Sequence, residues 1–182
     1  TAKFIDEKTI VINPKMQNVL TERGFGESQN DTLILNSFET LYLLYNNKLE
    51  LKKVNKNIIF DELIQKYIQK NDDILTRFLL YRDLRTKGYV VKDGFGFDSD
   101  FRVYEKGTYG QKDAKFLIFA FNEGTQQKIG KLYKNIHEIT QMGKEPIIAV
   151  IERRGEIIYY KINKMNFLEN KSELVMKDFN FN

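Results

Sequence analysis

The sequence contains no cysteine and no tryptophan, and it has only one histidine and two prolines among its 182 residues. Without cysteine there is no disulfide framework and no thiolate ligand for a metal, and a single histidine leaves little for zinc or another transition metal. We therefore expect chemistry that requires neither a metal nor another cofactor.

Long apolar runs are also absent. No stretch approaches the roughly 20 apolar residues that a membrane-spanning helix requires, and the first residues show no basic start followed by an apolar block. Hydrophobic residues make up 42% of the chain and charged residues 30%, which is enough for a core with a well-solvated surface. We expect a cytoplasmic protein without membrane association.

The net charge of +4 is unevenly distributed. Residues 1–80 contain 11 Lys and Arg against 11 Asp and Glu, whereas residues 81–182 contain 18 against 14, so the excess lies in the second part. That part is the better candidate for a surface that binds a polyanion. Ordinary lysine-rich solvation explains the composition equally well.

Residues 1–71 show the pattern of a small α+β domain. The opening segment alternates apolar runs with turn residues, such as TIVI before Asn13-Pro14, which indicates strands. Residues 33–45 carry apolar side chains at three- and four-residue spacings, as in an amphipathic helix. A short strand, LELKKV, and a second helix over residues 61–69 complete the predicted domain.

Residues 72–166 predict an α/β, nuclease-like domain with a mixed central sheet. A helix over residues 72–87 ends at Gly88, a common position for a glycine after a helix. A further helix is expected over residues 128–142, and strands over residues 89–92, 101–105, 116–121, 147–151 and 157–162. Residues 167–182 are polar with scattered phenylalanines, and we expect them to form a tail.

Three phrases, in order, resemble the archaeal tRNA-intron endonuclease family over about residues 4–166. They are LILNSFETLYLLYNNKLEL, then YRDLRTKGYVVKDGFGFDSDFRVYEKG, and finally KEPIIAVIERRGEIIYYKI. The resemblance implies a subunit of the enzyme that cuts precursor tRNA at bulge-helix-bulge intron junctions. Cleavage in that family needs no metal and leaves 2′,3′-cyclic phosphate and 5′-hydroxyl ends.

The resemblance also implies a catalytic set. Such cleavage needs a base for the 2′-hydroxyl proton, an acid for the leaving 5′-oxygen and a cation near the phosphorane. Family members are thought to use a tyrosine, a histidine and a lysine. The match places Tyr104 on the tyrosine and Lys144 on the lysine, but Asp113, in a loop one residue short, stands at the histidine position. The structural alternatives are a packed core tyrosine and an exposed loop lysine.

The aspartate changes the functional expectation. A carboxyl group, with an ordinary pKa of about 4, is ionised at neutral pH, so it donates protons poorly and is repelled by phosphate. We expect Asp113 to be inactive and the chain to be the structural subunit of a heterotetramer, a dimer of dimers that includes a catalytic paralogous subunit. Two alternatives stay open: a catalytic subunit with a remodelled general acid, and an RNA-binding module that does not cleave.

Basic residues in or near the matched phrases are candidates for RNA binding, because unpaired bases often stack on arginine or aromatic groups. Those on the helix before Gly88 can equally form internal ion pairs with neighbouring acids such as Asp83, and the histidine can equally be a solvated helix residue. The candidates are Arg82, Arg85, Lys87, Arg102, Lys131, Lys134 and the only histidine, His137.

The final hairpin supplies candidates for subunit contacts. In the family its acidic turn is thought to enter a basic cleft of a neighbouring subunit. Here Glu152 and Glu156 bracket the turn, and the two arginines between them weaken its acidic character. A solvated hairpin turn is the alternative. The resemblance also implies a dimer formed through the strand over residues 157–162, which makes Tyr159 and Tyr160 interface candidates.

Overall fold

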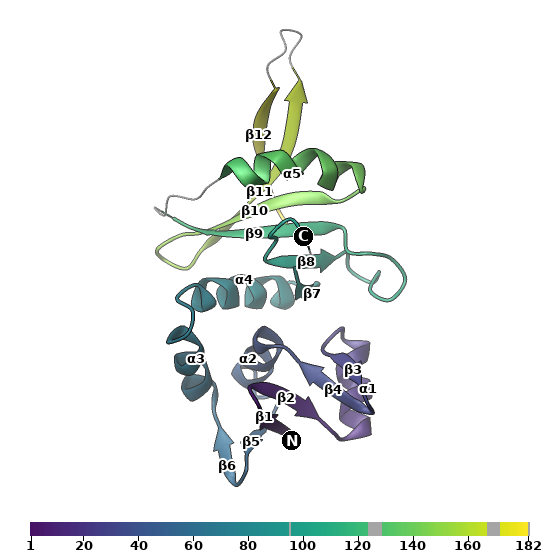
Figure 1. Ribbon diagram of the computed structural model, residues 1–182, viewed down its shortest axis with the longest axis vertical. Helices are drawn as coiled ribbons and strands as arrows, with labels where there is room; N and C mark the ends of the chain where they lie inside the picture. The colour runs from purple at the N-terminus through teal and green to yellow at the C-terminus, as the bar shows by residue number, and fades with distance from the viewer. Residues whose placement is uncertain (95, 124–128, 167–171, 182) are drawn as a thin grey trace. The chain divides into compact units, whose positions relative to one another are not determined.

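The computed structural model describes residues 1–94, 96–123, 129–166 and 172–181 (Figure 1). Side chains are described throughout these ranges except at residues 129–134, 164–166 and 172–174. The chain forms two compact units, Thr1–Arg82 and Asp83–Asn182. The division falls inside helix α4 (Ile74–Thr86), later than the boundary expected after residue 71, because the first half of α4 belongs to the N-terminal unit.

The N-terminal unit is an α+β domain, as expected. Its sheet has six strands in the order β3-β4-β2-β1-β5-β6, and only the β1–β5 pair is parallel. The strands are β1 (Ala2–Ile5), β2 (Lys8–Val11), β3 (Glu27–Gln29), β4 (Thr32–Leu35), β5 (Leu51–Lys53) and β6 (Lys56–Ile58). The other helices of the unit are α1 (Pro14–Glu22), α2 (Ser37–Tyr45) and α3 (Phe60–Ile68).

Helix α1 occupies a segment that the sequence pattern assigned to a strand-rich opening. The Asn13 side chain accepts a hydrogen bond from the Met16 amide at 3.0 Å and so caps the helix. Pro14 takes the first helical position, where its missing N–H costs nothing. The expectation was wrong for residues 14–22 because an Asn-Pro pair can start a helix as well as form a turn.

The helix expected over residues 33–45 is a strand followed by a helix. Asn36 separates β4 from α2 through a capping box, in which its side chain accepts from the Glu39 amide at 2.8 Å and Glu39 accepts from the Asn36 amide at 3.0 Å. The other carboxylate oxygen of Glu39 accepts from the Gly26 amide at 3.0 Å. These bonds satisfy a carboxylate that is only 1% exposed.

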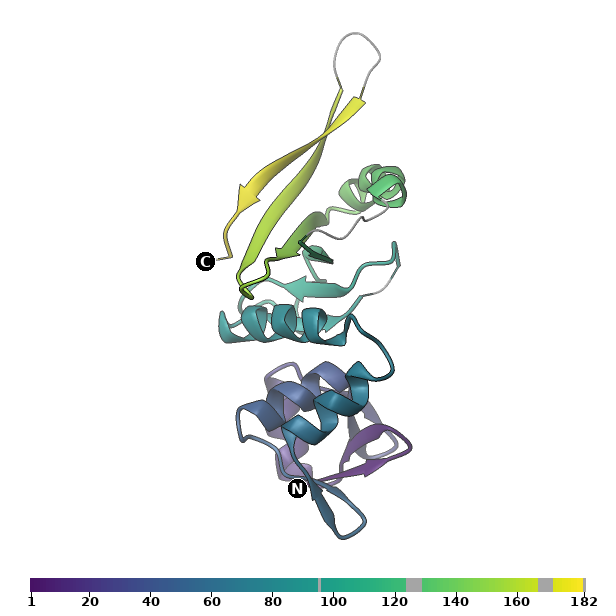
Figure 2. The ribbon, with the colours of Figure 1, turned by 90° about the vertical axis from the view of Figure 1, so that its left-hand side faces the viewer.

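The C-terminal unit contains a mixed six-stranded sheet in the order β12-β11-β10-β9-β8-β7, which confirms the expected sheet type. The β9–β10 pair is parallel, and the other pairs are antiparallel. The strands are β7 (Val90–Asp93), β8 (Phe101–Tyr104), β9 (Phe116–Asn122), β10 (Glu145–Ile151), β11 (Ile157–Asn166) and β12 (Ser172–Phe179). Helix α5 (Ile129–Gln141) packs against β10 and β11 (Figure 2).

Residues 172–179 form strand β12 rather than a tail. They pair antiparallel with β11, from Tyr159 opposite Phe179 to Asn166 opposite Ser172 (Figure 2). Phe181 follows the strand and is 7% exposed, with its ring centroid 4.7 Å from that of Tyr159. The expectation of a tail was wrong because the strand segment SELVMKDF contains Leu174, Val175, Met176 and Phe179 and pairs with β11.

None of the helices in the described ranges is long and apolar enough to cross a membrane. The same part of the chain contains no group of three or more His, Cys, Asp or Glu side chains that could hold a metal ion.

Candidate functional site

Strand β8 carries Tyr104 on the less buried face of the sheet. Phe101 and Val103 are buried, whereas Arg102 and Tyr104 are half-buried, because successive side chains of a strand point to opposite faces. The start of the strand is fixed by the Asp100 carboxylate, which accepts a hydrogen bond from the Ala120 amide at 2.7 Å. Tyr104 is therefore not enclosed in the core.

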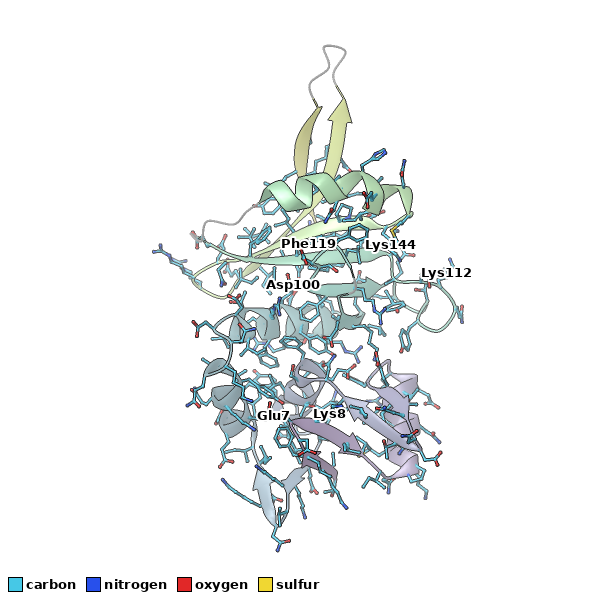
Figure 3. All side chains as sticks on the ribbon, in the orientation of Figure 1. Glu7, Lys8, Asp100, Lys112, Phe119 and Lys144 are labelled. Atoms are coloured by element: carbon cyan, nitrogen blue, oxygen red, sulfur yellow. The ribbon has the colours of Figure 1, made fainter. Side chains whose placement is uncertain are left out.

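Tyr104 and the loop after β8, residues 105–115, line an open cavity of about 550 Å³. Its walls come from one strand residue and five loop residues: Tyr104, Tyr109, Gly110, Gln111, Lys112 and Asp113. The ring of Tyr109 stands at 86° to that of Tyr104, with 5.0 Å between their centroids. Lys112 is labelled on this loop in Figure 3. The structure thus places Tyr104 and Asp113 in the wall of one cavity.

Lys144 lies immediately before β10; it does not line the cavity but is hydrogen-bonded to the loop that does. Its Nζ donates a hydrogen bond of 2.7 Å to the carbonyl oxygen of Ala114, the residue after Asp113. The side chain is half-buried, unlike that of an ordinary exposed loop lysine. A lysine ammonium has three donors, so this bond leaves two for other acceptors.

The two ends of the loop are held together by an ion pair between Glu105 and Lys115. The Lys115 amide also donates to the Val103 carbonyl at 3.0 Å, and the Glu145 amide donates to the Lys115 carbonyl at 2.8 Å. The hydrogen bond from Lys115 lowers the pKa of Glu105, and the same bond raises the pKa of Lys115. The loop is therefore anchored on both β8 and β10.

His137 does not take the missing histidine position. It is an exposed residue on α5, and its Nε2 lies 2.9 Å from the side-chain nitrogen of Gln141. It is not among the residues that line the cavity, and Asp113 is the carboxylate that lines it together with Tyr104.

Most RNA-binding candidates on or near α4 make internal contacts. Arg82 lies over the Tyr45 ring at 5.2 Å, within the N-terminal unit. In the C-terminal unit, Arg85 donates to the Tyr89 carbonyl at 3.3 Å, and Lys87 pairs with Asp83. These contacts agree with the alternative that basic residues on or near α4 make internal contacts rather than bind RNA. None of the three residues lines the cavity.

The other basic candidates lie in the C-terminal unit. Arg102 is two residues before Tyr104 on β8 and directly opposite Lys92 of β7, and its buried Nε has no hydrogen-bond partner among the described residues. Lys131 and Lys134 belong to α5, but their side chains fall outside the described residues. Arg102 is thus the candidate nearest in the chain to Tyr104.

The interface candidates have separate environments. The turn of the last hairpin closes through the Glu152 amide, which donates to the Glu156 carbonyl at 2.9 Å, and Glu156 is exposed. Tyr159 is 4% exposed and donates its hydroxyl hydrogen to Asp83. Tyr160 packs partly against the cluster of Leu117, Phe119, Ile136, Ile139, Ile148 and Ile162. Within the chain, residues 157–161 of β11 pair with β10 and residues 159–166 pair with β12.

Sequence reasoning missed Tyr109, Gln111 and Lys112 as cavity residues. The sequence did contain a pattern that could have predicted a loop turning back toward Tyr104, because Gly107 and Gly110 bracket an aromatic residue shortly after it. Both glycines have positive φ angles, +75° and +81°, which favour glycine and let the loop turn back toward the strand.

Comparison with known proteins gives matches over both units. The family described as tRNA intron endonuclease, N-terminal domain, matches residues 1–64, and its catalytic C-terminal domain matches residues 74–159. A tRNA-splicing endonuclease from Methanococcus maripaludis is 30% identical over 162 residues, which cover 88% of this chain and 92% of that protein. A protein of the same name from Thermococcus onnurineus is 29% identical over 152 residues, or 84% and 88% of the two chains. Strand β12 lies beyond the residues matched to the family.

Proposed function

The chain belongs to the tRNA intron endonuclease family, and on that premise we propose that it is a subunit of the enzyme that cleaves precursor tRNA at bulge-helix-bulge intron junctions. The observation that carries this proposal is the cavity shared by Tyr104 and Asp113, with Lys144 hydrogen-bonded to the next residue of the same loop. The arrangement offers a phenol and an ammonium close to a space open to RNA.

We further propose that this chain serves as the structural subunit. Formation of a 2′,3′-cyclic phosphate requires a proton for the leaving 5′-oxygen, and removal of a general acid commonly costs about 10²- to 10⁴-fold in rate. The family resemblance puts Asp113 at the position of the proton donor, Asp113 lines the same cavity as Tyr104, and carboxylates are ordinarily ionised at neutral pH. Its negative charge also opposes the approach of a phosphate.

A second candidate is a catalytic subunit with a remodelled general acid. The observation that favours it is the retention of both Tyr104, at the cavity wall, and Lys144, which is half-buried and hydrogen-bonded to the Ala114 carbonyl of the same loop. Under this alternative a water molecule or Asp113 itself delivers the proton. A third alternative is an RNA-binding module that does not cleave.

The structural role requires a catalytic paralogous subunit, and we propose a hetero-oligomer arranged as a dimer of dimers. Residues 157–161 of β11 already pair with β10 and residues 159–166 with β12, so a strand from another subunit would pair more readily with an outer strand of the sheet, β12 or β7. The Glu152–Glu156 turn remains a proposed contact for the basic cleft of a neighbour. A cytoplasmic location also remains a prediction.

Substitution of the aspartate provides the test. The purified chain should cleave a bulge-helix-bulge RNA only slowly, and Asp113→His should raise the rate by about 10- to 100-fold because it supplies a proton donor. Adding Tyr104→Phe to this variant should remove the gain. Equal, fast cleavage by the wild-type chain and by Asp113→His would instead establish the remodelled catalytic subunit.

A further inference from the structure

Three side chains that line the cavity have no part in the cleavage chemistry. Tyr109, Gln111 and Lys112 come from the middle of the loop over residues 105–115, and Tyr109 is half-buried while the other two are exposed. An aromatic ring, an amide and an ammonium group are thus gathered at one opening beside Tyr104.

We propose that Tyr109, Gln111 and Lys112 form a subsite for a single unpaired RNA nucleotide in the cavity that Tyr104 lines, whether or not this chain itself cleaves the RNA. This inference rests on the proposed function and specifies which part of the RNA the cavity holds. Aromatic side chains stack on unpaired bases, an amide both donates to and accepts from a base edge, and an ammonium attracts the backbone phosphate.

The geometry of the two tyrosines favours a splayed-out base over a duplex. Their rings are nearly perpendicular, with an interplanar angle of 86° and centroids 5.0 Å apart, so they form two walls of a corner. A planar base that lies parallel to one ring meets the other ring edge to face, an arrangement that aromatic groups prefer. A base inside a duplex is already stacked on both sides and cannot enter this corner.

The loop is held in shape before RNA arrives. The carbonyl oxygen of Thr108 accepts hydrogen bonds from the amides of Gln111 and Lys112, at 3.0 and 2.9 Å. The Glu105–Lys115 ion pair and the bond from Lys144 to Ala114 fix the ends of the loop. A site that is already ordered loses less conformational entropy when it binds, which favours affinity.

The charges orient the nucleotide. Lys112 is cationic and exposed, whereas Asp113 next to it is a carboxylate, so a phosphate is attracted to the Lys112 side and repelled from the Asp113 side. The ammonium of Lys92 lies over the Tyr109 ring, 5.9 Å from its centroid. The base is therefore expected against the tyrosines, with its phosphate toward Lys112.

Binding of two RNAs by the full chain tests the subsite. One is a hairpin with three-nucleotide bulges, and the other is the same hairpin with every base paired. Tyr109→Ala should weaken binding of the bulged RNA by about tenfold, since loss of base stacking costs about 1–3 kcal/mol. Tyr109→Phe should bind like the wild type. Gln111→Ala, an exposed substitution that does not endanger folding, should reduce the preference for bulged over paired RNA.

Lys112→Ala should lower the affinity for both RNAs and reduce the dependence on salt by about one counterion. Lys177→Ala is the matched control, because Lys177 is an exposed lysine on β12 of the same unit and should leave the affinity unchanged. The subsite is overturned if the bulged RNA binds Tyr109→Ala and Gln111→Ala as tightly as the wild type. Failure of the wild-type chain to bind either RNA would overturn the proposed function itself.

Discussion

Tyr104 and Tyr159 are both strand tyrosines of the same sheet, but their surroundings are opposite. Tyr104 is half-buried and lines an open cavity with the polar loop over residues 105–115. Tyr159 is 4% exposed, contacts the Phe181 ring and donates its hydroxyl hydrogen to Asp83. The contrast shows that the local environment of a strand tyrosine decides whether its hydroxyl is accessible to a substrate or is buried and bonded within the fold.

The two environments also differ in how the chain builds them. The cavity is made locally, by a loop that follows Tyr104 directly. The surroundings of Tyr159 are made from distant segments: Asp83 from α4, Lys87 just after α4, and Phe181 after β12. Substitutions among the packed rings of Tyr89, Phe116, Tyr159 and Phe181 should therefore affect the stability of the fold. Substitutions in the loop over residues 105–115 should affect RNA binding and the order of that loop.

The largest expected effect is on stability, from Phe181→Ala. Phe181 is 7% exposed, and its ring lies 4.9 Å from Tyr89, 5.3 Å from Phe116 and 4.7 Å from Tyr159, so truncation leaves a cavity. We expect a loss of about 3–5 kcal/mol in the free energy of unfolding, measured with urea. Met176→Ala, at a side chain that is 54% exposed on β12, is the control and should change it by less than about 0.5 kcal/mol. A small loss for Phe181→Ala would mean that β12 is not anchored as described.

A smaller effect on stability is expected from Tyr159→Phe. The change removes the hydroxyl that donates to Asp83 and keeps the ring, and such a bond to a charged group contributes about 1.5–3 kcal/mol. We expect a loss near the lower value at neutral pH, because Asp83 keeps its ion pair with Lys87. Tyr104→Phe, which removes a hydroxyl at the open cavity, should cost less than about 0.5 kcal/mol.

The pH dependence of the same variant sharpens the comparison. Burial, followed by the hydrogen bond to Asp83, raises the pKa of Tyr159 above its ordinary value. The unfolded chain then releases this proton at a lower pH than the folded chain, so the contribution to stability is complete below about pH 10 and declines as the pH rises further. Unfolding at pH 8 and pH 11 should show a smaller decline for Tyr159→Phe than for the wild type. Equal declines would contradict the assigned environment, since other tyrosines contribute alike to both proteins.

Much of the C-terminal sheet could be predicted from the sequence, because apolar segments such as FLIFAF form buried strands with few alternatives. The errors fell where local sequence allows two structures. Asn13-Pro14 starts α1 instead of a turn, and Asn36 ends a strand that helical spacing had joined to α2. Strand β12 depends on pairing with β11 and on Phe181, which no local pattern reveals.

The site was predictable in part. The family resemblance predicted Tyr104, Lys144 and Asp113 as candidates. Hydrophobic periodicity alone could not have predicted that Tyr104 and Asp113 line one cavity or that Lys144 is bonded to the same loop. Tyr109, Gln111 and Lys112 were missed because the direction of side chains in a loop depends on its turns and ion pairs. The bond between Lys144 and the Ala114 carbonyl likewise joins residues 30 positions apart.

The smallest expected effect is local and comes from Lys115→Ala, which breaks the ion pair that joins the two ends of the cavity loop. The side chains of Lys115 and Glu105 are 37% and 43% exposed, so we expect little change in global unfolding, as is usual for pairs near the surface. Amide hydrogen exchange should accelerate at residues 105–113, while the strands of the sheet keep their protection. High salt should produce a similar but weaker acceleration in the wild type, because ions screen the pair. Lys106→Ala, in the same loop but outside the Glu105–Lys115 pair, is the control, and equal acceleration in both variants would mean that Lys115 does not order the loop that faces Tyr104.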